Sequence, residues 1–120
     1  MYFYTTKENR KNLLISNELV NDNNLVLLKA NTSDAATEKH VPVVTIDGNK
    51  VSVIVGEVVH PMLEEHLISH IILETDKEVK IVKLTHIDEP KAEFILNDEK
   101  PIAVYEYCSL HSLWKKEINE

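Results

Sequence analysis

Residues 47–56 read DGNKVSVIVG, and this stretch decides the fold class. Asp47-Gly48 is a strong signal for a two-residue β-hairpin turn. Valine then occupies every second position, at Val51, Val53 and Val55. A period of two is typical of a β-strand with one buried face. The stretch therefore predicts a hairpin turn that leads into a half-buried strand.

The chain from residue 40 onward repeats this β pattern. Apolar runs or alternations follow at residues 67–73, 79–84, 92–96 and 102–108, with turn residues between them. No stretch shows a sustained helical period of about 3.6 residues. Roughly five to seven short antiparallel strands in about 80 residues indicate a sandwich or a barrel. We favour an all-β antiparallel sandwich.

Residues 1–30 are expected to form a small separate β segment. They contain three short apolar patches, around Phe3, Leu14 and Val26, and no cysteine. So short a segment cannot bury a core of its own without a metal or a disulfide. It must pack against residues 31–120, which we take as the sandwich domain, or against a second subunit. This need favours a homodimer or a higher homo-oligomer.

The composition excludes several classes of function. The 120 residues carry a formal net charge of −7 at pH 7, whereas a nucleic-acid binder needs a basic face. No apolar run approaches the roughly 20 residues that span a bilayer, so we expect no membrane partner. The N-terminal residues lack the apolar core of a signal peptide, which favours the cytoplasm. The single cysteine, Cys108, excludes an internal disulfide and a four-cysteine metal site within one chain.

The histidines and the cysteine are the main candidates for chemistry. Cys108 and His111 are three residues apart in an expected loop, and a thiolate with an imidazole suits zinc, copper or iron. A buried free cysteine beside a surface histidine explains this pair equally well. His60 and His66 flank a loop that contains proline, so they are not a helical metal pair. Taken alone, they and His40 are more simply surface or structural histidines.

The combined pattern is more informative than its parts, because the donors lie at strand ends or in loops. Structural zinc usually closes with four ligands, and zinc does not change its redox state. Blue copper needs an axial methionine, for which no motif follows Cys108. Four histidines and one cysteine favour a six-coordinate iron with one open position. His70, within a strand, and His86, in a loop, are left out of this site.

Four stretches of the chain resemble the superoxide reductases, the family of neelaredoxin and desulfoferrodoxin. They read DAATEKHVPV (34–43), GEVVHPMLEEHLI (56–68), EPKAEF (89–94) and YEYCSLHSLW (105–114). The resemblance implies an immunoglobulin-like sandwich that holds one mononuclear iron. It further implies that this iron reduces superoxide to hydrogen peroxide, and that an external donor such as rubredoxin returns the electron.

The resemblance also implies roles for single residues. Cys108 corresponds to the axial thiolate, and the equatorial iron ligands correspond to His40, His60, His66 and His111. In the family the histidine nearest the cysteine binds through Nδ and the other three bind through Nε. Glu38 corresponds to a carboxylate that can occupy the sixth position of the ferric ion. Lys39 adds positive charge that would attract superoxide, and it could order a water that delivers a proton.

The chain departs from the family at a few positions. The N-terminal segment resembles a degenerate desulforedoxin-like domain that has lost its metal, so we expect one iron per chain. The family usually has asparagine at Ser109, glycine at Ser112 and tryptophan at His70. If position 112 requires a positive φ, Ser112 carries strain that glycine would not. The competing function is a non-catalytic iron electron-transfer module, but such a carrier has no use for the Glu38–Lys39 pair.

Overall fold

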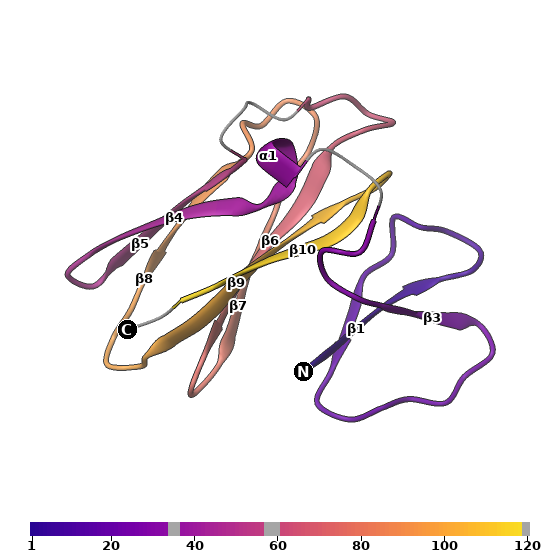
Figure 1. The fold of residues 1–120 in the computed structure, drawn as a ribbon, viewed down its shortest axis with the longest axis horizontal. Helices are drawn as coiled ribbons and strands as arrows, with labels where there is room; N and C mark the ends of the chain where they lie inside the picture. Colours follow the sequence, from indigo (N-terminus) through magenta and orange to yellow (C-terminus); the bar gives the residue numbers. More distant parts are fainter. Residues whose placement is uncertain (34–36, 57–60, 119–120) are drawn as a thin grey trace.

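The computed structural model describes residues 1–33, 37–56 and 61–118, and for Glu38 only the backbone. These ranges form antiparallel strands and one short helix (Figure 1). The helix is α1 (Thr37–His40), and the strands are β1 (Tyr2–Thr6), β2 (Leu14–Ser16), β3 (Leu25–Leu28), β4 (Pro42–Asp47), β5 (Lys50–Val55), β6 (Ile68–Thr75), β7 (Val79–Lys83), β8 (Lys91–Ile95), β9 (Pro101–Cys108) and β10 (Ser112–Glu117). Within these ranges, no helix is both long and apolar enough to cross a membrane.

The stretch 47–56 forms the predicted hairpin. β4 and β5 pair antiparallel with Asp47 opposite Lys50, so Gly48 and Asn49 make a two-residue turn. Gly48 has a φ of 60°, a left-handed conformation that glycine adopts without strain. The side chains of the three alternating valines on β5 are at most 1% exposed. The predicted core face of this strand is confirmed.

Two antiparallel sheets face each other and share one core. One sheet has the strand order β4-β5-β8, and the other has the order β10-β9-β6-β7. Val53 and Phe94 from the first sheet pack in the same buried cluster as Ile71 and Val104 from the second. Burial of this apolar surface supplies the main driving force for joining the sheets. The predicted all-β antiparallel sandwich is confirmed.

Strand β9 is buried on both of its faces. Its side chains alternate as the sequence predicts, yet every residue from Ala103 to Cys108 is buried. Val104 and Cys108 belong to the core between the sheets, whereas Tyr105 and Tyr107 belong to a second buried cluster. A strand with two buried faces must be covered by a third layer of structure.

The N-terminal sheet, with the order β2-β1-β3, provides that layer. Phe3 is 2% exposed, and its ring centroid lies 4.5 Å from that of Tyr105. Partly buried side chains of the same segment, Leu13 and Leu28 among them, pack against this second cluster. Figure 1 shows the indigo and violet N-terminal strands beside the sandwich. Residues 1–30 therefore pack against the sandwich of their own chain.

The candidate residues that the structure describes, His40, His66, Cys108 and His111, lie at one end of the sandwich. Helix α1 precedes β4 there, residues 61–67 lead into β6, and a short turn joins β9 to β10 (Figure 1). The backbone hydrogen bond from Val41 N to Thr37 O (3.0 Å) closes the turn of α1, and the bond from Gly56 N to Val41 O (3.1 Å) ties the end of this turn to the residue after β5. The rigid sheets thus position residues that are far apart in the sequence.

Candidate metal centre

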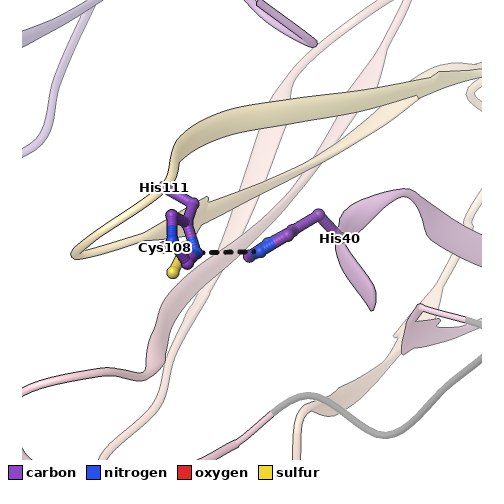
Figure 2. Close-up of side chains that lie close together, drawn as sticks. All are labelled: His40, Cys108 and His111. Carbon is purple, nitrogen blue, oxygen red and sulfur yellow. Dashed lines mark hydrogen bonds between the residues drawn. The ribbon is translucent and has the colours of Figure 1, made fainter. Parts of the chain in front are cut away.

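Three of the expected donors meet at this end of the sandwich. Cys108 ends β9, His111 lies in the turn that follows, and His40 ends α1. The Cys108 Sγ and one ring nitrogen of each histidine all lie within 4.8 Å of one another. The His40 Nε2 and the His111 Nδ1 are 3.1 Å apart. Figure 2 shows these two nitrogens facing each other, with the cysteine sulfur beside the His111 ring.

His40 is held on two sides. Its Nδ1 lies 3.3 Å from the Oε1 of Glu106, and both side chains are almost fully buried. The Trp114 ring stacks on the His40 ring with a centroid distance of 5.1 Å and an interplanar angle of 14°. Because Glu106 takes the Nδ1 side, the Nε2 is the nitrogen that faces His111.

Glu106 is a buried carboxyl group that the sequence patterns did not bring into the site. Its side chain is 0% exposed, and its Oε2 has no hydrogen-bond partner among the described residues. Burial raises the pKa of Glu106 well above its usual 4.5. Strand parity could have indicated it, because Glu106 lies two residues before Cys108 on β9 and so shares its face.

His66 joins the same group of rings. Its ring centroid lies 4.9 Å from that of His111, and the two rings meet edge to face at 84°. Two backbone hydrogen bonds of 3.0 Å with Leu63 fix the local chain at His66. Burial and the neighbouring His111 lower the pKa of His66 below 6.5, with Lys39 acting in the same direction and Glu65 opposing it. The neutral imidazole, which is the form that binds metals, is therefore favoured.

Cys108 is fully buried at the base of this group, with 0% exposure. Burial raises the pKa of the Cys108 thiol to about 11, although hydrogen bonds from the backbone amides of His111 and Leu110 oppose this rise. Glu106 adds to the rise, and the charge of Arg10 lowers the pKa. A cation that binds here must displace the thiol proton, as metals do at other cysteine sites.

The turn between β9 and β10 is tied to neighbouring elements. The backbone N–H of Ser109 donates to Leu67 O (3.1 Å), and the Trp114 Nε1 donates to His111 O (2.9 Å). Ser112 has a φ of 69°. The position does adopt the left-handed backbone, so the strain that the sequence raised as a condition applies to this serine.

Of the other predicted site residues, His60 and the side chain of Glu38 lie outside the part of the chain that the structure describes. Lys39 is half-buried and lies close enough to lower the pKa of His66. His70 lies on β6 with its Nδ1 2.8 Å from Ser69 Oγ, and His86 is exposed in a turn.

The chemistry of the donor set fits a single transition-metal ion. One sulfur and two imidazole nitrogens converge, and a carboxyl group stands behind the far nitrogen of His40. Metal-binding histidines commonly have such a carboxylate partner, which fixes the tautomer and leaves the other nitrogen for the metal. Soft and borderline donors of this kind suit iron, copper or zinc rather than calcium or magnesium.

The fold and the donor cluster together define a β-sandwich with a candidate mononuclear metal centre of thiol and imidazole groups. The family model for desulfoferrodoxin matches residues 32–117. The chain is 49% identical over 89 residues to the desulfoferrodoxin of Clostridium acetobutylicum, an alignment that covers 74% of this chain and 70% of that one. It is 44% identical to a desulfoferrodoxin homolog of Archaeoglobus fulgidus, with the same coverage. The chain belongs to the desulfoferrodoxin family.

Solved structures agree with this assignment. The superoxide reductase of Treponema pallidum superposes with a TM-score of 0.74 and 39% identity, and the match covers 78% of each chain. A superoxide reductase (1Fe-SOR) of Giardia intestinalis superposes with a TM-score of 0.62 and 29% identity, over 69% of this chain and 99% of that one. The family resemblance stated from the sequence motifs is confirmed.

Proposed function

We propose that this protein is a superoxide reductase that holds one mononuclear iron. The observation that carries the proposal is the convergence of Cys108 Sγ with one ring nitrogen each of His40 and His111 within 4.8 Å. Membership of the desulfoferrodoxin family supports it. The overall reaction joins one superoxide anion, one electron and two protons to give one hydrogen peroxide, so no oxygen is produced.

The proposed ligands are four histidines and one cysteine: His40, His60, His66, His111 and Cys108. When bound, iron would supply one electron to superoxide and recover it from an external donor such as rubredoxin. The two ring nitrogens that face each other, His40 Nε2 and His111 Nδ1, are the atoms expected to bind. Cys108 would act as a thiolate, because a bound cation favours loss of its proton.

Other residues of the chain would prepare the site for this chemistry. Glu106 and Trp114 hold the His40 ring from two sides. Lys39 would attract the superoxide anion and hold a water that delivers a proton, since its charge already reaches His66. Glu38, in the same turn of α1, is proposed to occupy the substrate's place between turnovers.

The proposal also divides the chain into two parts. Residues 1–30 are proposed to be a degenerate desulforedoxin-like segment without a metal, and residues 31–120 are proposed to be the iron-binding domain. A homodimer or a higher homo-oligomer is also proposed. Light scattering of the purified chain gives its mass in solution, and metal analysis gives the number of irons per chain.

The deciding experiment mixes the reduced, iron-loaded protein with a source of superoxide. The expected result is hydrogen peroxide without release of oxygen, and one iron oxidised for each superoxide consumed. A protein that binds iron but leaves superoxide unreacted would instead be an electron-transfer module. Zinc as the metal in the purified protein would contradict both functions.

A further inference from the structure

Arg10 connects the N-terminal segment to Tyr107, directly before Cys108, and to Leu110, two residues after it. It lies in the turn between β1 and β2 and is exposed. Its Nη2 donates a hydrogen bond to the carbonyl oxygen of Leu110 (3.1 Å). Its own carbonyl oxygen accepts a hydrogen bond from the Tyr107 hydroxyl (2.5 Å). One residue from the N-terminal sheet thus contacts both the residue before Cys108 and the turn after it.

We propose that Arg10 is a positioning residue for the metal centre, and that the N-terminal segment acts through it as a brace for the turn Cys108–His111. This inference rests on the proposed role of Cys108 and His111 as iron ligands. It assigns a use to a segment that contains no cysteine and cannot hold a metal site of the four-cysteine kind.

Within the turn, the residues on either side of Leu110 are hydrogen-bonded to residues of the sandwich. Ser109 is tied to Leu67 and His111 is tied to Trp114, both within residues 61–118. Leu110, between them, is 45% exposed, and its carbonyl oxygen receives the guanidinium of Arg10. Without Arg10, this carbonyl would bond to water and the tip of the turn would move more freely.

Ser112, at the end of the turn, has a φ of 69°. A serine keeps this strained backbone conformation only when surrounding contacts enforce it, so contacts that hold the turn matter here. Tyr107 is 1% exposed, so its hydroxyl requires the Arg10 carbonyl as an acceptor beneath the N-terminal sheet. The two hydrogen bonds therefore restrain the chain before and after the proposed thiolate ligand.

The test compares Arg10→Ala with a control variant, Lys11→Ala, which removes the positive charge of the exposed neighbouring residue. The first readout is amide hydrogen exchange of residues 105–113 in the metal-free protein. The second is the rate at which the iron-loaded protein loses its metal to a chelator. Loss of one hydrogen bond should speed both about 2- to 10-fold in Arg10→Ala, whereas Lys11→Ala should match the wild type.

Further variants separate positioning from a general loss of stability. Arg10→Lys should recover part of the effect, and Tyr107→Phe should speed exchange in the same residues. The visible band from thiolate to iron should shift in Arg10→Ala, and the midpoint potential should fall because a nearby positive charge is lost. Both readouts report on the centre rather than on folding.

Two results would overturn the inference. One is equal exchange in Arg10→Ala and Lys11→Ala, and the other is faster exchange with unchanged metal loss, band and potential. If the wild type binds no iron at all, the proposed function fails. The exchange comparison in the metal-free protein then still decides whether Arg10 braces the turn.

Discussion

The Oε1 of Glu106 lies 3.3 Å from the Nδ1 of His40, and the two side chains are 0% and 2% exposed. A carboxyl group and an imidazole thus share one buried contact directly behind the candidate metal centre. Since the other nitrogen of His40 faces His111, any change at Glu106 acts on the site through the orientation and basicity of a single ring.

Glu106→Gln should make the metal-free protein more stable at neutral pH. Burial raises the pKa of Glu106 in the folded protein well above the 4.5 that applies to the unfolded chain. At a pH between these two pKa values, the folded chain holds a proton on Glu106 that the unfolded chain has lost. Stability therefore falls as the pH rises above about 4.5, by at most about 1.4 kcal/mol per pH unit. Glutamine does not ionise, so urea unfolding at pH 5 and pH 8 should show a smaller decline than in the wild type.

The same substitution should weaken metal binding. A bound cation favours the ionised form of Glu106, whose charge raises the basicity of the His40 ring, whereas glutamine can accept the hydrogen bond of His40 but cannot ionise. The metal affinity should fall about 10-fold or more, as measured by competition with a chelator. Glu8→Gln, at an exposed position of the N-terminal segment, is the matched control and should change neither property.

Ser112→Gly should stabilise the fold. Ser112 has a φ of 69°, which costs a residue with a side chain more than it costs glycine. The expected gain in the free energy of unfolding is about 1 kcal/mol, measured by denaturant titration of the metal-free protein. Ser112→Ala keeps the Cβ atom and should give no gain. Equal stability of the glycine and alanine variants would contradict strain at this position.

Lys39→Ala should slow the reaction of the reduced protein with superoxide. Removal of a positive charge near the site weakens the attraction of the anion, and the slowing should shrink at high salt because ions screen that attraction. Pulse radiolysis at two ionic strengths measures this rate. Lys116→Ala removes an exposed charge on β10 as the control, and an identical rate in Lys39→Ala and Lys116→Ala would exclude steering by Lys39.

Lys39→Ala should also raise the pKa of His66 in the metal-free protein. Lys39 is one of the charges that lower this pKa, although burial and His111 contribute more. The change should therefore be small, and it can be followed by NMR titration of the His66 ring. Because neither metal nor substrate is present, this titration tests only whether the charge of Lys39 lies near His66.

Cys108→Ser should abolish the visible band that arises from charge transfer between thiolate and iron. Serine retains the size of the side chain but lacks the sulfur orbital that produces the band. A band that persists at full intensity in Cys108→Ser would remove Cys108 from the proposed ligand set.

The sheets could be predicted from the sequence because their signals are local. The alternation of Val51, Val53 and Val55 and the turn at Gly48 each depend on neighbouring residues only, and both occur in the structure. The two buried faces of β9 could not be predicted in this way. Burial of Tyr105 and Tyr107 depends on the N-terminal sheet, whose position is set by contacts between distant parts of the chain.

The candidate site shows the same division. The spacing of Cys108 and His111 left a metal pair and a buried cysteine beside a surface histidine equally open. The family motif favoured the metal pair and added His40 and His66, whose rings do gather with that of His111. Glu106 and Arg10 escaped notice because an isolated acidic or basic residue has an exposed surface position as its ordinary explanation. Only the packed structure shows that Glu106 is buried against His40 and that Arg10 reaches Leu110.

Because both faces of β9 are buried, the sandwich cannot be separated from residues 1–30 without exposing apolar side chains. A protein shortened to residues 31–120 would leave Tyr105, Tyr107 and Leu113 facing water, because Phe3 and its neighbours now cover them. An exposed apolar surface of this kind beside β9 promotes aggregation. Residues 1–30 therefore act as a cover that keeps this apolar face of the sandwich out of water.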